Sequence, residues 1–151
     1  MDKQPILICY DGSADAERAI DAAAALFGSR HTFVLTVAPT ITFAEAAAAT
    51  SAIVPAQSFE HLNRAEALEQ ARAGVSYALR AGLEAHPRVE MSPTTWRAIV
   101  DVAEELDAAA IVIGSRGLSG LREFARGSVS HDVATHAHRP VLIVPPKEEK
   151  Q

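Results

Sequence analysis

Four of the eight glycines in this 151-residue chain fall between residues 114 and 127, after an apolar run and before a short helical pattern. Glycine lets backbone N–H groups approach an anion closely, and a helix N-terminus adds unpaired N–H donors and a favourable dipole. A strand, a glycine-rich loop and a helix start therefore predict a phosphate site. Ser128 would add its hydroxyl group, and Ser128, Val129 and Ser130 would add their backbone N–H groups.

The spacing of these glycines separates the stretch from two widespread nucleotide-binding motifs. No Gly-Lys-Ser/Thr sequence follows the glycines, so the stretch is not a P-loop. The Rossmann fingerprint places its glycines within about six residues after the first strand, whereas these are spread out after a late strand. The alternative without a ligand is a surface loop whose glycines only form turns.

The distribution of charge favours a small anion over a polymer. The chain has a net charge of -5 and a pI near 5.6, so no broad basic face is available for nucleic acid. Within the glycine stretch, however, Arg116, Arg122 and Arg126 are opposed only by Glu123. This local positive patch suits phosphate groups.

The composition predicts one globular domain that spans residues 1–151. A hydrophobic content of 48% with 22% charged residues is ordinary for such a domain. The single cysteine, Cys9, excludes an internal disulfide framework, and its apolar neighbours predict an inert buried thiol. The sequence has no signal-peptide pattern and no run of about 20 apolar residues, so we expect a cytoplasmic protein without a membrane segment.

The hydrophobic pattern predicts strands and helices in alternation. Strands are expected at residues 5–10, 31–38, 89–91, 109–113 and 140–145. Helices are expected at residues 13–28, at about 59–85, from Thr94 or Thr95 to about 107, and at 129–137. The first helix should be capped by Ser13 and carry Leu26 on its inward stripe. The long helix is expected to bury Leu62, Leu68, Val75 and Leu79.

This alternation predicts an α/β fold with a doubly wound, Rossmann-like parallel sheet of five strands and helices on both faces. With the expected strand order 3-2-1-4-5, the order reverses between strands one and four, where such sheets bind ligands at their carboxyl ends. Asp11 follows the first strand and Gly114 ends the fourth, so the two should meet in one crevice. The Asp11 carboxylate could accept hydrogen bonds from ribose or hold a water molecule of Mg²⁺. The alternative is an aspartate that only forms a turn.

The glycine stretch resembles the ATP-binding pattern of the universal stress protein family. That pattern is glycine, two residues, glycine, nine residues, glycine, and then serine or threonine. Gly114, Gly117, Gly127 and Ser128 meet every position of it. The resemblance covers nearly the whole chain and also includes residues 10–13, 102–106 and 140–144.

The resemblance implies that the protein binds ATP, or AMP or ADP, with Mg²⁺ as an optional companion of the nucleotide. It implies that the backbone of Val37 or Ala38 meets the adenine edge and that Ile113 lines the adenine or ribose pocket. It also implies a homodimer in which residues 141–144 pair with their counterpart. The predicted nucleotide-binding set is Tyr10, Asp11, Gly12, Val37, Ala38, Ile113, Gly114, Arg116, Gly117, Gly127, Ser128, Val129 and Ser130.

The chain departs from the family pattern after the third predicted strand. Many relatives have a Gly-Asp-Pro-like turn there, whereas residues 92–97 of this chain read Ser-Pro-Thr-Thr-Trp-Arg. Trp96 would either cover the mouth of the nucleotide site or pack on a helix face, and packing is the simpler role. The departure affects the adenine side of the predicted site and leaves the phosphate side unchanged.

Residue types that usually carry catalysis are not assembled into a site. Lysine occurs only near the two ends of the chain, so neither a lysine clamp on phosphate nor Schiff-base chemistry is expected. His131, His136 and His138 do not share one helical face, which argues against a metal site there. No Gly-x-Ser-x-Gly elbow is present. We therefore predict no catalytic residues and no metal held by the protein itself.

Three functions stay open at this point. The first is a stress-response regulator whose dimer depends on bound adenine nucleotide. The second is an interaction or chaperone-like module that keeps the fold without using nucleotide. The third is an enzyme, either a weak ATPase or a nucleotide transferase. The complete glycine pattern favours the first.

Overall fold

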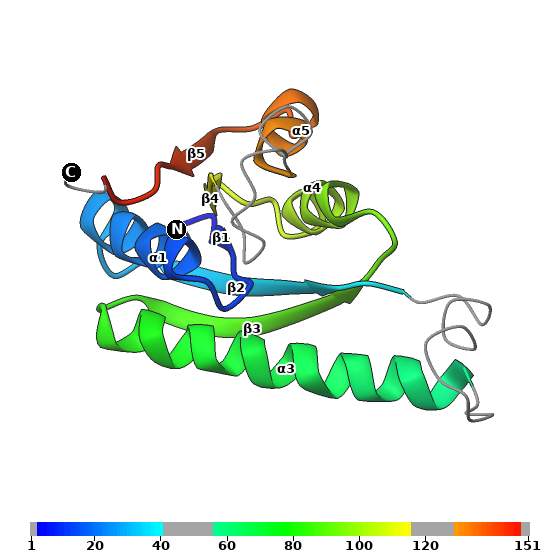
Figure 1. Ribbon diagram of the computed structural model, residues 1–151. Coiled ribbons are helices and arrows are strands. Elements are labelled where there is room, and N and C mark those ends of the chain that lie inside the picture. Colours follow the sequence, from blue (N-terminus) through cyan, green and yellow to red (C-terminus); the bar gives the residue numbers. More distant parts are fainter. Residues whose placement is uncertain (1–2, 41–55, 116–128, 149–151) are drawn as a thin grey trace.

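The computed structural model describes residues 3–40, 56–115 and 129–148. One sheet of five parallel strands has the order β3-β2-β1-β4-β5, which confirms the predicted fold class and strand order (Figure 1). The strands are β1 (Ile6–Cys9), β2 (His31–Ala38), β3 (Glu84–Met91), β4 (Ala110–Gly114) and β5 (Val141–Val144). The helices are α1 (Ala14–Phe27), α3 (Ala56–Arg80), α4 (Thr95–Glu105) and α5 (Val129–His136).

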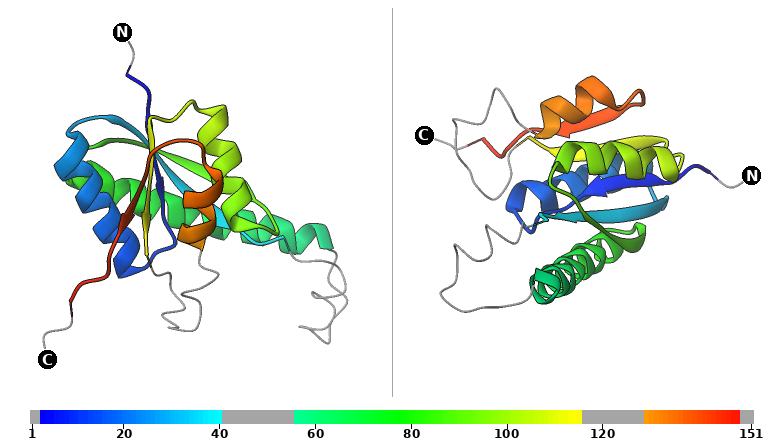
Figure 2. Two further views of the ribbon diagram at one scale, coloured as in Figure 1. Left: turned by 90° about the horizontal axis from the view of Figure 1, so that it is seen from above. Right: turned by 90° about the vertical axis from the view of Figure 1, so that its right-hand side faces the viewer.

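The sheet is the middle layer of three (Figure 2). Side chains alternate between the two faces of a strand. Ile6 and Ile8 of β1 therefore pack against α1 and α3, while Leu7 packs against α4 and α5. Because both faces are covered, β1 and β4 are apolar along their whole length. That run of apolar residues made these strands predictable.

Helix α1 begins and ends where the sequence predicts. The Ser13 side chain accepts a hydrogen bond of 3.1 Å from the Ala16 N–H, and Gly28 ends the helix with a φ of 65°. The prediction that Leu26 faces the core is wrong, because its side chain is 65% exposed. Phe27, which the same helical spacing also predicts to face inward, packs against the core in the last turn.

The buried face of α3 matches the predicted one only in part, because Val75 packs against the core but two of the predicted leucines do not. Leu62 and Leu79 are 63% and 55% exposed, so they lie outside the buried stripe. The side of α3 that packs on the sheet consists of small residues, which are Ala67, Ala71, Gly74 and Ala78. These positions repeat with the same helical period, but small side chains let the helix backbone approach the sheet more closely than leucines would. The helix also ends at Arg80, before the predicted end near residue 85.

Gly74 marks the closest approach of α3 to the sheet, and its replacement by alanine should destabilise the fold. A Cβ atom there would lie 2.7 Å from Cδ1 of Tyr10 and 2.8 Å from Cγ1 of Val34, both of them buried side chains. Alanine improves helix propensity by about 1 kcal/mol, whereas overpacking a core costs about 1–3 kcal/mol. We expect Gly74→Ala to lower the free energy of unfolding by about 1 kcal/mol or more in urea denaturation.

The control for this prediction is the exposed neighbour Ala73. Ala73→Gly reports helix propensity alone and should cost about 1 kcal/mol. A stabilised Gly74→Ala protein would mean that the contact with Tyr10 relaxes without cost, and it would contradict the close packing of α3.

Strand β3 is longer than predicted, since it runs from Glu84 to Met91 and includes residues assigned to the preceding helix. The strand lies at the edge of the sheet, and Ala85 is its only buried residue. Polar residues on its other face hide the apolar signal of a strand. Pro87 is compatible with an edge strand, where a missing ladder donor is tolerated.

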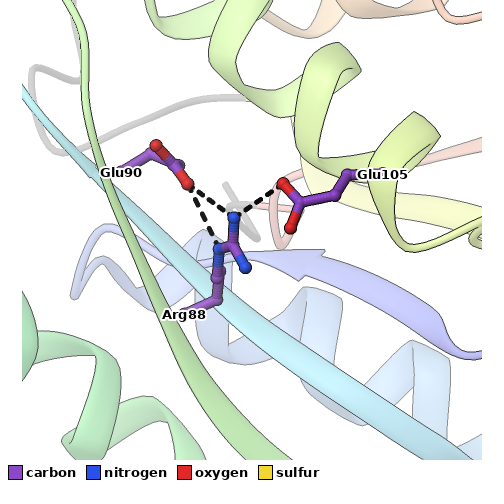
Figure 3. Close-up of polar contacts among 3 residues, drawn as sticks. All are labelled: Arg88, Glu90 and Glu105. Carbon is purple, nitrogen blue, oxygen red and sulfur yellow. Dashed lines mark hydrogen bonds and ion pairs between the residues drawn. The ribbon is translucent and has the colours of Figure 1, made fainter.

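An arginine joins β3 to α4 (Figure 3). Nη2 of Arg88 donates hydrogen bonds of 2.7 Å to Oε1 of Glu90 and 2.8 Å to Oε2 of Glu105. The hydrogen bond to Glu90 is the main cause of a raised pKa of Arg88. Partly exposed ion pairs add little stability, so this cluster is a weak link between β3 and α4.

Helix α4 begins at the predicted place, but its N-cap side chain does not form the expected hydrogen bond. Thr94 holds the N-cap position of α4, but its side chain makes no capping bond. Ser92 Oγ instead accepts a hydrogen bond of 3.1 Å from the Thr94 N–H.

In the described ranges no helix combines the length and apolar character needed to span a membrane.

Candidate functional site

Hydrogen bonds between side chains and the backbone hold the loop after β1 in place. Asp11 Oδ1 accepts a hydrogen bond of 3.0 Å from the Ser13 N–H, and Gly12 adopts a φ of 81° that favours glycine. The Tyr10 carbonyl accepts a buried hydrogen bond of 2.9 Å from Thr36 Oγ1, which ties the loop to β2. The Asp11 carboxylate is therefore presented in a fixed orientation at the carboxyl end of the sheet.

Gln70 of α3 is a residue of this site that sequence reasoning missed. Its Nε2 donates a hydrogen bond of 2.8 Å to the Asp11 carbonyl. A Cβ atom at Gly12 would lie 2.9 Å from the same nitrogen, but this is the end of a flexible side chain that could move, so the φ of 81° is what favours glycine at position 12. The signal that could have found Gln70 is its place beside Ala67, Ala71 and Gly74, but that stripe was not recognised as the buried face.

The end of β4 lies against the start of α1. A Cβ atom at Gly114 would lie 3.0 Å from the carbonyl oxygen of Asp15. The Ser115 N–H donates a hydrogen bond of 2.9 Å to the Val144 carbonyl. Because β4 pairs with β1, Gly114 and Asp11 lie at the same edge of neighbouring strands. The structure thus brings together the two positions that the sequence placed about a hundred residues apart.

Gly114 has a packing role that requires no ligand. Its missing side chain lets the β4 backbone lie beside Asp15. Next to it, Ser115 Oγ is buried and has no hydrogen-bond partner among the described residues. A buried hydroxyl without a partner costs about 1–3 kcal/mol, so this oxygen at the end of β4 is suited to a water molecule or a ligand.

The two candidates for the adenine edge differ in where their backbone groups point. The Leu35 carbonyl accepts from the Tyr10 N–H on the β1 side, and the Ala38 carbonyl accepts from the Ser92 N–H on the β3 side. In a strand the backbone groups alternate between the two neighbours. The backbone N–H and C=O groups of Val37 therefore point to the same side as β1, at a level past the end of that strand. The backbone groups of Ala38 point toward β3.

Acidic groups gather near the start of α1. Burial is the main cause of a raised pKa of the Tyr10 hydroxyl, and the charges of Glu17 and Asp11 add to it. Burial raises the pKa of the Cys9 thiol to about 12, which agrees with the predicted inert thiol, although the residue as a whole is half-buried. An anion bound here needs a cation to offset these carboxylates.

The comparisons with known proteins decide the family. A family model described as the universal stress protein family matches residues 3–145. The chain belongs to the universal stress protein family.

Relatives in this family resemble the chain over different lengths. Universal stress protein YxiE of Bacillus subtilis is 52% identical over 46 residues, which are 30% of this chain and 31% of that protein. The match thus spans about a third of this curated relative's length. A universal stress protein from Archaeoglobus fulgidus has a solved structure with a TM-score of 0.68 and 28% identity, over 95% of both chains. A structure of the universal stress protein from Archaeoglobus fulgidus in complex with dAMP has a TM-score of 0.63 and 28% identity, over 95% of this chain and 99% of that one.

The universal stress protein pattern is only partly covered by the described residues. Gly114 ends β4, Ile113 is buried in the core next to it, and Val129 and Ser130 open helix α5. Ser130 is buried, and Val129 packs against the apolar core. Arg116, Gly117, Gly127 and Ser128 lie outside the described residues.

Trp96 occupies the place where the sequence departs from the universal stress protein pattern, and it packs between helices. Its ring stacks on His136 of α5 with centroids 4.4 Å apart, and it contacts the apolar core under α4. Of the two roles considered for Trp96, the contacts favour packing. His136 Nδ1 also lies 2.8 Å from the Asp132 carbonyl.

Proposed function

We propose that the chain binds an adenine nucleotide in the crevice between the carboxyl ends of β1 and β4 and acts as a nucleotide-dependent stress regulator. The observation that carries this proposal is the meeting of Asp11 and Gly114 at neighbouring strand ends, with the complete glycine pattern following Gly114 in sequence. The Archaeoglobus fulgidus universal stress protein, 28% identical, was solved with dAMP. This supports an adenine nucleotide as the ligand class.

The nucleoside half would lie against β1, β2 and β4. The backbone of Val37 meets the adenine edge, since its groups face the β1 side while the Ala38 carbonyl is engaged by Ser92. The Asp11 carboxylate accepts from the ribose hydroxyls in the orientation that the Ser13 N–H fixes. Thr36 and Gln70 support this geometry through the backbone of residues 10 and 11.

The phosphates would follow the glycine stretch toward α5. Gly117, Gly127 and Ser128 let backbone N–H groups surround the phosphate oxygens, and the start of α5 at Val129 and Ser130 adds its dipole. Arg116 supplies positive charge. Mg²⁺ bound with the nucleotide would offset the carboxylates of Asp11 and Glu17, whose charges act on Tyr10.

The second part of the proposal is a homodimer through β5. This strand is an edge of the sheet, and Ile143 on it is 39% exposed. An open apolar edge strand is an aggregation hazard unless another strand covers it. A second copy of the chain, pairing strand against strand, would remove that hazard.

Calorimetric titration of nucleotide-stripped protein with magnesium ATP tests the proposed binding. We expect saturable binding of one nucleotide per chain with a Kd on the order of 1–100 μM, corresponding to about -8 to -5 kcal/mol. AMP should compete with ATP, whereas GTP should not, because the Val37 backbone is assigned to the adenine edge. No heat at several temperatures would overturn the proposal in favour of an interaction module, and release of phosphate would indicate an ATPase.

A further inference from the structure

Three potential metal ligands gather at the amino ends of β2 and β3, on the left of Figure 1 and at the opposite end of the sheet from the crevice. His31 opens β2 and is paired in register with Glu84, which opens β3. His86 follows Glu84 by two positions and therefore points to the same face of the strand. The sheet register thus brings together side chains that lie more than fifty residues apart in sequence.

The distances in this cluster suit a shared ion. Nδ1 of His31 lies 3.6 Å from Oε1 of Glu84, and the ligand atoms of all three residues lie within 4.8 Å of one another. A tetrahedral zinc ion with bonds of about 2.0–2.1 Å places two of its ligand atoms about 3.3 Å apart. The pair of His31 and Glu84 is already close to this spacing. His86 is exposed, and exposed side chains change rotamer readily, so its ring can turn toward the ion.

An aromatic side chain supports both imidazoles. The Phe33 ring meets the His31 ring edge-on at 5.1 Å and lies 6.0 Å from the His86 ring. The two imidazole centroids are 4.8 Å apart. These contacts and the β2–β3 ladder hold the rings on one side of the sheet, so ordering them around an ion costs less conformational entropy than ordering three free side chains.

We propose that His31, Glu84 and His86 bind a divalent transition-metal ion of the zinc type. Two imidazole nitrogens and one carboxylate are a known set of three protein ligands for zinc, with water in the fourth position. Calcium and magnesium require oxygen ligands and are disfavoured by the two nitrogens. The bound ion connects β2 to the edge strand β3. The sequence alone predicts no protein-held metal; the proposed site goes beyond that prediction and is independent of the proposed nucleotide site.

Zinc titration of the full chain, prepared without a histidine tag and treated with EDTA, tests this site. We expect one saturable equivalent in calorimetry, and visible absorption from tetrahedral coordination when Co²⁺ replaces zinc. His31→Ala and His86→Ala should each weaken binding by about tenfold or more. The matched control is His61→Ala, which removes an exposed histidine of α3 and should leave zinc binding unchanged.

Thermal melts in EDTA establish that each variant folds, and Glu84→Gln offers a second variant of nearly the same shape. Added zinc should raise the melting temperature of the wild-type chain and of His61→Ala, and it should not raise that of His86→Ala. The proposal is overturned if the wild-type chain gives no saturable binding. It is equally overturned if binding survives in both His31→Ala and His86→Ala.

Discussion

Gly127→Val is expected to weaken binding of magnesium ATP by about a hundredfold or more while leaving the fold intact. In the proposed site the backbone N–H groups that follow this glycine approach the phosphates. Hydrogen bonds to a charged group are worth about 1.5–3 kcal/mol each. Loss of two such bonds costs about 3–6 kcal/mol, which exceeds the roughly 2.8 kcal/mol that separates Kd values a hundredfold apart. Calorimetric titration measures the loss, and a thermal melt without nucleotide reports the fold.

Gly120 provides the matched control for this experiment. It lies in the same stretch but outside the four fixed positions of the ATP-binding pattern. Gly120→Val therefore introduces the same side chain into the same segment and should bind nucleotide nearly as well as the wild-type chain. Full affinity in Gly127→Val would sink the assignment of the phosphate site. Equal losses in both variants would assign the effect to the stretch as a whole.

Ile143→Pro is expected to convert the proposed dimer into a folded monomer. The carbonyls of Pro140 and Val144 both accept hydrogen bonds from the β4 side. Because backbone groups alternate along a strand, those of Ile143 point away from β4, toward the open edge. Proline at this position removes an outward N–H donor and leaves the β4–β5 ladder intact. In a twofold dimer the same donor is lost from both copies.

Sedimentation velocity at several protein concentrations measures the oligomeric state, and circular dichroism reports the fold. The neighbouring variant Leu142→Pro is the contrast, because the N–H of residue 142 faces β4. It should destabilise the chain by roughly 3 kcal/mol or more, whereas Ile143→Pro should leave the melting temperature of the monomer nearly unchanged. An Ile143→Pro protein that stays dimeric would place the contact between copies elsewhere.

The sheet and the meeting of Asp11 and Gly114 at neighbouring strand ends could be predicted because their signals are local. Apolar runs bounded by glycine and proline identify β1, β4 and β5, and the strand order follows from right-handed crossovers between alternating elements. That order alone placed Asp11 beside Gly114. No three-dimensional information beyond the alternation of elements was needed for this step.

The features that escaped prediction depend on contacts between distant elements. The buried stripe of α3 carries alanine and glycine because the helix lies close to Tyr10 and Val34, and nothing in the helical period distinguishes it from the more apolar leucine stripe. The predicted third strand is shorter than β3 because one face of β3 is polar and hides the apolar signal of a strand. The cluster of His31, Glu84 and His86 appears only when the β2–β3 register is known.

The close contact between Gly114 and Asp15 has a consequence for the evolution of the family. The glycine is needed for β4 to lie against α1, so selection for a stable fold retains it even in a lineage that has lost its nucleotide. Positions 117, 127 and 128 would be released from constraint in such a lineage. If the proposed function is correct, the first glycine marks the shared fold, and the later positions carry the information on whether a member binds nucleotide.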